Sequence, residues 1–484
     1  MEIKILTESN TADTFLIPVF NDENIEKDLI KICRKYRLDQ IRITDEFEGK
    51  KGEIVSSYFT KSGNTSKVVL IGLGESDFGV NQKTLKGFFT KQKKLSGEVM
   101  VDMNHLKKVH QLMLSQAFVG GSILGTYNLG LYKTEQNTRP SFKLNIQSTK
   151  HVSDIQRLIT EAQHIAETQR SIMDLVNAPA NKKTPQDLGN WAANSGKKYG
   201  YQVDVFDKKK ITEIGLNALL AVGQGSHVPP IFIVCEYKGE GANKTVGLVG
   251  KGVTFDTGGL SIKPSSKMHY MKSDMGGAAA VLGTIEAAAK LRLPIHLIAM
   301  IPSTENSVDA NSVKPGDIIH SYSGKTIEVI DTDAEGRLIL ADALAYMTKN
   351  YKVDTLIDFA TLTGSVIRAL GYHAAGIMSN NDALQSAIAQ AGDSIGERVW
   401  PLPIWKDYED ALDSDVADVK NLSDLPLAGA ITAAKFLEVF INDHPNWAHI
   451  DIAGTAFADS ELGKQKHATG YGVRLMIEAL KARF

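Results

Sequence analysis

From Asn177 onward, the sequence alternates short apolar runs with alanine-rich stretches of helical spacing. The two clearest helical stretches cover about 276–290 and 337–349, and the apolar runs that we predict to be strands are 245–249, 295–301, 326–330, 355–359 and 449–452. Strands that alternate with helices favour a mainly parallel sheet covered by helices on both faces. Ligands of such sheets bind beyond the carboxyl ends of the strands. The residues that follow each strand are therefore the first candidates for chemistry.

The chain of 484 residues is long enough for two or three folding units, and its first part has a different pattern. Residues 1–150 mix short β-like runs with polar helical stretches, which predicts a smaller N-terminal α/β domain. Apolar residues at helical spacing, without an internal Gly or Pro, predict a connecting helix over 151–176. Residues 177–484 then form the predicted catalytic α/β domain.

Charge and cysteine content narrow the function classes. Lys plus Arg total 54 against 56 Asp plus Glu, so the net charge of -2 creates no overall field that attracts nucleic acid or anionic membrane. Cys33 and Cys235 are too few for a disulfide framework and fit a reducing compartment. We find no secretory signal at the start and no apolar run of the roughly 18 residues that span a bilayer. We expect a cytoplasmic protein without a membrane partner.

Acidic and basic residues gather near three predicted strand ends. Lys251 and Asp256 follow the run 245–249 among four glycines, Asp274 precedes the helix at 276, and Asp333 and Glu335 follow the run 326–330. Four carboxylates in one place repel one another unless cations hold them, and two divalent ions about 3.5–4 Å apart would do so. Hard oxygen ligands suit Zn or Mn, with Co or Mg as alternatives. The pattern predicts a site for two divalent metal ions.

Each of these residues has a plainer interpretation when it is taken alone. A carboxylate after a strand is more often a helix cap or a surface residue, and Asp274 fits a cap well. Isolated lysines such as Lys251 and Lys263 are usually solvated, and the glycine pairs 258–259 and 276–277 alone would indicate tight turns or close packing. Their co-occurrence in one α/β unit favours a shared site.

Four segments resemble the leucyl aminopeptidase family, also called the cytosol aminopeptidase family: Val249–Pro264, Met271–Met275, Asp331–Leu338 and Ala360–Gly364. The resemblance extends from about Asp174 to Gly454, and the core Asp-Ala-Glu-Gly-Arg-Leu is highly specific to the family. The N-terminal part resembles the family's variable domain only in outline. The resemblance implies a metallo-exopeptidase that hydrolyses the N-terminal bond of peptides, prefers Leu or other apolar first residues, and forms a homohexamer.

The same resemblance implies a role for each site residue. Lys251, Asp256, Asp274, Asp333 and Glu335 become the ligands of two metal ions, which activate a water molecule. Lys263 and Arg337 become the non-ligand catalytic pair, in which Lys263 stabilises the oxyanion and Arg337 anchors a bicarbonate ion that carries the proton. The implied pocket for the first side chain comprises Met271, Thr361, Gly364, Ala453 and Ala456.

Three positions depart from the family pattern. Asp331 replaces the more usual Asn, and Thr257 replaces a usual Ser, neither of which should alter the chemistry. Ala456 lies where some relatives have Met, which bears on the preferred side chain.

Other enzyme classes fit the sequence less well. None of the 12 His residues forms the His-Glu-x-x-His spacing of zincins, and the Gly-x-Ser-x-Gly motif of serine hydrolases is absent. Another two-metal hydrolase, acting on phosphoesters, remains the main alternative among enzymes. A second alternative is a nucleic-acid-binding role for the N-terminal domain, because Lys83, Lys86, Lys91, Lys93 and Lys94 form a basic cluster. A charge run of this kind is more often a solvated helix face, so we do not expect a nucleic-acid partner.

Overall fold

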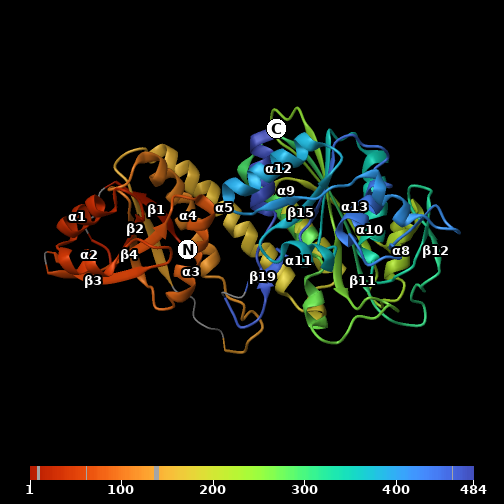
Figure 1. Cartoon of the computed structure of the whole chain (residues 1–484), viewed down its shortest axis with the longest axis horizontal. Coiled ribbons are helices and arrows are strands. Elements are labelled where there is room, and N and C mark those ends of the chain that lie inside the picture. Colours follow the sequence, from red (N-terminus) through yellow and green to blue (C-terminus); the bar gives the residue numbers. More distant parts are fainter. Residues whose placement is uncertain (8–10, 62, 136–140, 460–461, 484) are drawn as a thin grey trace. The chain divides into compact units, whose positions relative to one another are not determined.

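Two units of the computed structural model can be described separately, one comprising Met1–Arg170 and the other mainly residues from Ser171 onward (Figure 1). The structure describes residues 1–7, 11–61, 63–135, 141–459 and 462–483. Helix α5 (Val152–Asn177) contains the division between the units within its length. Among the described residues, we find no helix with both the length and the apolar character needed to cross a membrane.

A six-stranded sheet with the order β1-β6-β5-β2-β4-β3 organises the N-terminal unit. All neighbouring strands are parallel except the β3–β4 hairpin. The strands are β1 (Ile3–Leu6), β2 (Thr14–Phe20), β3 (Ile54–Lys61), β4 (Asn64–Gly74), β5 (Gly97–Asp102) and β6 (Phe142–Gln147). The helices are α1 (Ile25–Tyr36), α2 (Gln40–Glu46), α3 (Phe78–Lys91) and α4 (Lys108–Gly125). The central strand β2 is buried along its whole length, as expected for a strand covered on both faces.

Helices α3 and α4 pack closely against each other because α4 has glycines at the contact. A Cβ atom added at Gly125 would lie 2.5 Å from the main-chain oxygen of Lys86, and one at Gly121 would lie 2.9 Å from the Cβ of Leu85. Any side chain at these positions would push the two helices apart. This packing fixes one face of α3 and leaves the residues on its other face available for other contacts.

The main sheet of the C-terminal unit has nine strands, eight of which follow the order β16-β15-β18-β14-β9-β11-β8-β7, while β10 pairs with β11. The middle strands are parallel, and antiparallel pairs occur only at β15–β18, β11–β8 and β8–β7. Their bounds are β7 (Gln202–Phe206), β8 (Ile231–Lys238), β9 (Thr245–Gly250), β10 (Gly252–Asp256), β11 (His296–Asn306), β14 (Thr355–Ala360), β15 (Ala375–Ser379), β16 (Val399–Pro401) and β18 (Trp447–Asp451).

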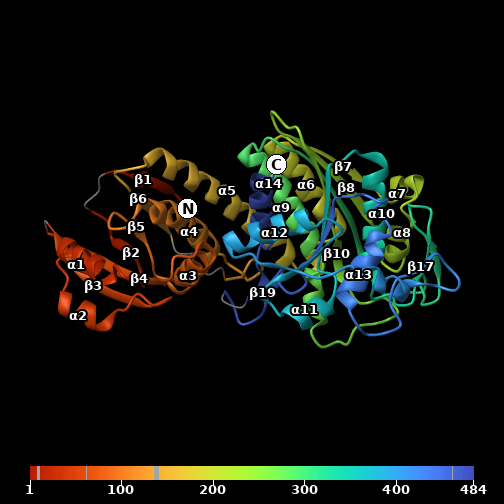
Figure 2. The ribbon, with the colours of Figure 1, turned by 45° about the horizontal axis from the view of Figure 1, so that its top comes forward.

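Helices cover both faces of this sheet (Figure 2). One face carries α6 (Pro185–Tyr199), α9 (Gly276–Leu291), α12 (Asp382–Ile395) and α14 (Val473–Arg483). The other carries α8 (Asn217–Gly223), α10 (Glu335–Asn350) and α13 (Gly429–Glu438). The remaining helices are α7 (Lys208–Ile214), α11 (Gly364–Leu370), η1 (Ala180–Lys182), η2 (Met268–Ser273), η3 (Lys406–Tyr408) and η4 (Asp410–Leu412). The predicted fold class, a smaller α/β domain followed by a mainly parallel α/β domain, is confirmed.

One predicted strand has a different place from the one that we expected. The run 326–330 forms only the short strand β13 (Thr326–Glu328), which pairs with β12 (Ile318–His320) and β17 (Val419–Lys420) in a separate three-stranded sheet. A further small sheet pairs β19 (Phe457–Asp459) with β20 (His467–Ala468). Asp333 and Glu335 therefore do not follow a strand of the main sheet. They lie just before and at the start of α10.

Candidate active site

The end of strand β9 brings Lys251 next to the end of strand β14. The backbone N–H of Lys251 donates to the carbonyl oxygen of Phe359 over 2.9 Å, which continues the pairing of the two parallel strands. Gly250 allows this approach, because a Cβ atom there would lie 2.7 Å from the main-chain oxygen of Gly277. The start of α9 thus lies directly beside the β9 end, and Asp274 and Lys251 come together.

Lys251 forms the centre of a buried ion cluster. Its Nζ lies 2.7 Å from Oδ2 of Asp274 and 2.9 Å from Oε1 of Glu335, and it donates to the main-chain oxygen of Thr361 over 3.1 Å. A Cβ atom at Gly336 would lie 2.5 Å from the Cε of Lys251, so the lysine stem packs against the first turn of α10 where only glycine leaves room.

A second lysine neutralises the other carboxylates. Nζ of Lys263 lies 2.7 Å from Oδ2 of Asp256 and also donates to Oδ1 of Asp333. Asp256, Asp333 and Glu335 each offer one carboxylate oxygen, and these oxygens all lie within 4.8 Å of one another. The seven residues predicted as metal ligands or catalytic groups thus include six that share one interconnected cluster. The seventh, Arg337, follows Glu335 in the first turn of α10.

The loop between Asp256 and Lys263 adopts a conformation that requires glycine. Gly258 and Gly259 have φ angles of +89° and +65°, in the left-handed region that side chains disfavour. The N–H of Gly258 donates to Oδ1 of Asp256 over 2.9 Å, so the turn directs a backbone donor toward this carboxylate. The glycine pair is therefore a tight turn, and that turn also orients a site residue.

Three residues that the sequence reasoning missed support the cluster. Asn306, at the end of β11, donates through Nδ2 to Oδ1 of Asp256 (2.9 Å) and to the main-chain oxygen of Thr332 (3.0 Å). Asn421 receives a hydrogen bond from Arg337 on its main-chain oxygen (2.8 Å) and donates to the main-chain oxygen of Asp331 (2.7 Å). Neither asparagine belongs to a sequence motif, and only the fold reveals these contacts.

Lys183 is the third of these residues. It is only 1% exposed and donates to the main-chain oxygen of Lys272, two residues before Asp274. Burial, followed by the positive charge of Lys272, lowers the pKa of Lys183 to about 7. Its hydrogen bond fixes the end of η2, from which the chain enters the site.

The electrostatics of the cluster follow from burial and from crowding of like charges. Burial raises the pKa of Asp274 well above its usual value, and the nearby carboxylates Glu335 and Asp256 raise it further despite Lys251. Burial and then Asp256 raise the pKa of Asp333 to about 7. For Lys251 and Lys263, burial alone would lower the pKa, but the surrounding carboxylates outweigh it, so both ammonium groups have raised pKa values.

Arg337 carries a buried positive charge with unused hydrogen-bonding capacity. Burial lowers its pKa to about 10, which still leaves the guanidinium charged at neutral pH. The side chain is 5% exposed, and in the described part of the chain its Nε has no hydrogen-bond partner. Glu335 Oε2 is also buried and without a partner there. Buried polar atoms without partners are uncommon, and each calls for an explanation such as an ion.

The structure contradicts the plainer interpretations of two site residues. The N-cap of α9 is Met275, with no side-chain capping bond, while Oδ1 of Asp274 accepts from the hydroxyl of Thr361 over 2.8 Å. Asp274 is therefore not a helix cap. Lys251 is 3% exposed and is not a solvated surface lysine.

Two of the five predicted specificity residues lie beside the start of α9. Thr361 and Ala456 both flank Gly276, since a Cβ atom there would lie 3.0 Å from a carbon of each. Ala453 is tied to the loop after β14 through Asp451, whose Oδ1 accepts from the N–H groups of Ala453 (3.2 Å) and Leu362 (3.1 Å). The last two members, Met271 in η2 and Gly364 at the first turn of α11, lie on the segments that lead to and from this region.

Comparison with known proteins assigns the chain to a family. The family model described as "Cytosol aminopeptidase family, catalytic domain" matches residues 170–477, and the model for the N-terminal domain of that family matches residues 16–136. A probable cytosol aminopeptidase of Chlorobium limicola is 55% identical over 291 residues, which cover 60% of this chain and 58% of that relative. Another, from Chlorobium phaeobacteroides, is 42% identical over 458 residues and 90% of each chain.

Solved structures agree with this assignment. A tomato leucine aminopeptidase mutant superposes with a TM-score of 0.88 at 31% identity, over 100% of this chain and 97% of that one. The bottromycin maturation enzyme BotP in complex with Mn gives a TM-score of 0.86 at 29% identity, over 98% and 99%. The chain belongs to the cytosol aminopeptidase family of peptidase hydrolases.

Proposed function

We propose that this chain is a metal-dependent aminopeptidase that hydrolyses the N-terminal bond of peptides. The observation that supports the proposal most strongly is a cluster of four carboxylates in a chain of the cytosol aminopeptidase family: Asp256, Asp274 and Glu335 are buried, and Asp333 is partly exposed. So many carboxylates are rarely gathered in a protein interior without a purpose, because their mutual repulsion and desolvation cost stability.

The donor set fits divalent metal ions. The oxygens of Asp256, Asp333 and Glu335 lie within 4.8 Å of one another, and Glu335 Oε2 has no partner among the described residues. Lys251, Asp256, Asp274, Asp333 and Glu335 would hold two ions, with Zn or Mn favoured by the oxygen-rich set and Co or Mg as alternatives. When bound, such ions acidify water and polarise the carbonyl group of the scissile bond. The similarity to BotP, a protein solved in complex with Mn, supports the choice of Mn.

Lys263 would act on the substrate as a fixed positive charge. Its side chain is 20% exposed, whereas that of Lys251 is 4% exposed, so Lys263 is the more accessible of the two ammonium groups. The carboxylates keep its pKa raised, which makes it a hydrogen-bond donor and not a base. A donor at this place stabilises the negative charge that develops on the attacked carbonyl oxygen.

Arg337 would bind a bicarbonate ion. Its buried Nε lacks a partner in the described residues, and a planar guanidinium can donate to two oxygens of a planar anion such as bicarbonate. A guanidinium with a pKa of about 10 does not accept a proton at neutral pH. Bicarbonate, when bound, can accept and return a proton, which is the chemistry that Arg337 cannot supply.

The finer parts of the proposal concern specificity and assembly. Thr361 and Ala456 beside Gly276, with Met271, Gly364 and Ala453, would form a small, mainly apolar wall for the first side chain, which favours Leu or another apolar residue. A cytoplasmic location and a homohexamer belong to the same proposal and depend on the family likeness alone.

The decisive test is removal and return of metal. Dialysis against a chelator should abolish hydrolysis of Leu-p-nitroanilide, and Mn, Zn or Co should restore it. Asp256→Asn should lose metal and activity together, whereas Asp45→Asn, a change at an exposed position in the N-terminal unit, should lose neither. Full activity in a metal-free preparation would contradict the proposal. Hydrolysis of p-nitrophenyl phosphate without hydrolysis of the peptide analogue would favour the phosphoester alternative instead.

A further inference from the structure

The N-terminal unit contains a cavity of about 280 Å³ whose charged lining residues are all lysines. One wall is the face of α3 with Lys83 and Lys91, and the opposite wall is the turn before β3 with Lys51. The sequence pattern predicted that the lysines of α3 form a solvated face, and Lys83 and Lys91 are both exposed. The structure places two of them at a concave site together with a third lysine from a distant part of the chain.

A glycine keeps this cavity open. Lys83, Gly87 and Lys91 follow one another at four-residue spacing on α3, so they lie above one another on the same helix face. A Cβ atom at Gly87 would meet nothing within 4 Å, and the residue has no positive φ angle that would require glycine. Glycine lowers helix stability here without any local benefit. Its effect on the structure is the open space between the two lysines.

The opposite wall is fixed in place. The N–H of Gly52 donates to the oxygen of Gly72 over 2.8 Å, and the N–H of Gly74 donates to the oxygen of Gly49 over 2.9 Å. A Cβ atom at Gly72 would lie 2.2 Å from the oxygen of Lys50, so the turn packs directly on the backbone of β4. Lys51 is therefore presented from a turn that is hydrogen-bonded to the central sheet.

The three ammonium groups lack counter-charges. Within the described ranges of the chain, none of the residues Lys51, Lys83 and Lys91 forms a salt bridge. Neighbouring acids are already engaged: Glu48 pairs with Lys50, and Glu53 accepts from the backbone N–H groups of Glu48 and Lys50. Three like charges around one cavity repel one another, and an anion between them would remove that repulsion.

The inner surface of the cavity is apolar. Ile71 is fully buried in β4, and Phe88 on α3 is 4% exposed, while Ile54 borders the opening. Ligand pockets combine such apolar surface with a few polar groups that orient the ligand, and their volumes are typically about 300–1,000 Å³. At about 280 Å³, this cavity lies just below that range, which suits a compact molecule.

We propose that this cavity binds a small organic anion. The anionic group lies between Lys51, Lys83 and Lys91, and the apolar part contacts Ile54 and Phe88. A zwitterionic amino acid fits poorly, because its ammonium group would join three positive charges. The expected ligand is a carboxylate or phosphate monoester that has an apolar part and no amine. This site is separate from the peptidase residues, and the proposal does not depend on the proposed function.

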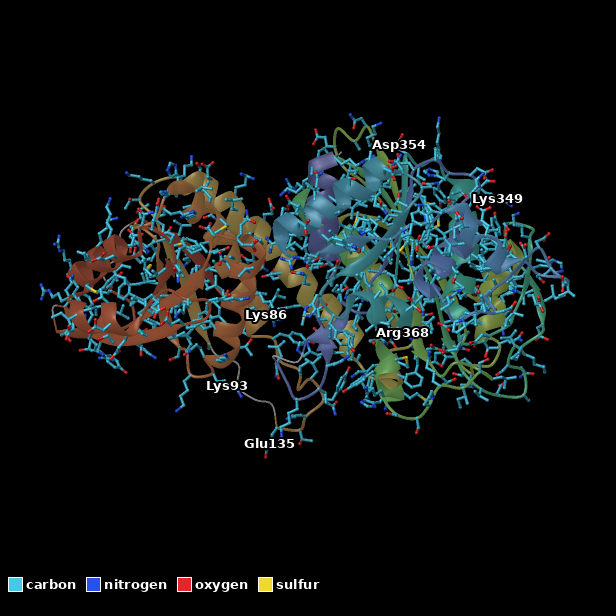
Figure 3. All side chains as sticks on the ribbon, in the orientation of Figure 1. Lys86, Lys93, Glu135, Lys349, Asp354 and Arg368 are labelled. Carbon is cyan, nitrogen blue, oxygen red and sulfur yellow. The ribbon has the colours of Figure 1, made fainter. Side chains whose placement is uncertain are left out.

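The test uses phenyl phosphate as the probe and isothermal titration calorimetry of the full chain at low salt. Phenylacetate replaces the phosphate by a carboxylate, and inorganic phosphate removes the apolar part. Gly87→Leu fills the cavity but keeps every charge. The triple variant Lys51→Ala, Lys83→Ala, Lys91→Ala removes the charges, and a control triple variant, Lys27→Ala, Lys93→Ala, Lys94→Ala, removes three exposed lysines that do not line the cavity. Lys93 lies at the edge of the N-terminal unit in Figure 3.

We expect phenyl phosphate to bind at least about tenfold more tightly than inorganic phosphate. Gly87→Leu should weaken binding about tenfold or more, and each lysine removed from the cavity should weaken it by a similar factor. The control triple variant should bind like the unmodified chain. Equal binding of both phosphates together with full tolerance of Gly87→Leu would show general attraction to lysines and would overturn the proposal. Absence of binding by both organic probes would overturn it as well.

Discussion

The two units of this chain use lysine in opposite ways. In the C-terminal unit, Lys251 and Lys263 have carboxylates within 3 Å and are largely removed from solvent. In the N-terminal unit, Lys51, Lys83 and Lys91 line an open cavity and form no salt bridge in the described part of the chain. Both units are α/β folds with mainly parallel sheets. The fold class therefore does not determine the role of a lysine, and the neighbouring charges do.

The largest effect that would test this difference between the units is expected from removing Lys263, the lysine that we propose acts on the substrate. Lys263→Ala should lower kcat about 100-fold or more while both metal ions remain bound, because it removes an oxyanion-stabilising charge and no proposed ligand. Steady-state kinetics with Leu-p-nitroanilide and metal analysis of the same preparation would measure both effects. Lys91→Ala in the N-terminal cavity is the matched control and should leave kcat unchanged. Loss of metal with normal kcat after metal is added back would assign Lys263 to metal binding instead.

A second contrast concerns one helix glycine from each unit. Gly277, in α9, leaves no room for a side chain, since a Cβ atom would lie 2.0 Å from the oxygen of Phe359. Gly277→Ala should lower the free energy of unfolding of the C-terminal unit by about 1–3 kcal/mol. At Gly87, in α3, the added methyl group would point into open space. Gly87→Ala should therefore raise the free energy of unfolding of the N-terminal unit by about 0.5–1 kcal/mol.

Calorimetric unfolding combined with hydrogen exchange in each unit would separate these two changes. Equal tolerance of alanine at both positions would mean that the close contact of α9 with β14 relaxes easily. The position of Asp274 would then depend less on Gly277 than we infer.

The proposed pocket for the first side chain belongs to the C-terminal unit. Ala456 is 5% exposed and lies beside Gly276, so a longer side chain there would occupy space near the proposed pocket. Ala456→Met should lower kcat/KM for peptides that begin with Met or Phe more than for those that begin with Ala, by about 1–3 kcal/mol. Kinetics on a series of aminoacyl-p-nitroanilides would measure this. A uniform loss on all substrates would show that Ala456 does not line the pocket.

The last prediction concerns the pH dependence of metal binding. Burial and Asp256 raise the pKa of Asp333 to about 7, so below that pH the metal-free protein holds a proton that a cation must displace. Above it, the carboxylate is free. The affinity for Mn should therefore fall about tenfold for each pH unit below 7, in addition to any slope from Lys251. Calorimetric titrations at pH 6, 7 and 8 would measure the change. Equal affinities at pH 6 and 8 would exclude Asp333 as a ligand that loses a proton.

Part of this architecture could be predicted because it depends on short, local patterns in the sequence. The helices predicted over 276–290 and 337–349 correspond to α9 and α10, and the run 245–249 corresponds to β9. Lys251 and Asp256 could be related to a common site because they follow the same strand within a few residues. Parallel topology then brings separate strand ends together without further information.

The remainder depends on contacts between distant segments. The short run 326–330 gave no sign that its partners would be β12 and β17 and not the main sheet, since periodicity identifies a strand but not its neighbour. Asn306 and Asn421 are ordinary polar residues until the fold places them beside Asp256 and Arg337. In the same way, the sequence did not indicate that Lys51 and the lysines of α3 line one cavity.

The positions of Lys251 and Lys263 among the carboxylates have a consequence for the order of folding and metal binding. They balance much of the negative charge that would otherwise oppose folding, so folding of this unit would not require a bound metal. If the proposed metal site is correct, a divalent ion would enter a folded site and displace the ammonium groups from the carboxylates. The rate of that exchange would depend on how readily the two lysine side chains move aside. Metal supply would therefore control how many finished molecules are competent, while the number of folded molecules stays the same.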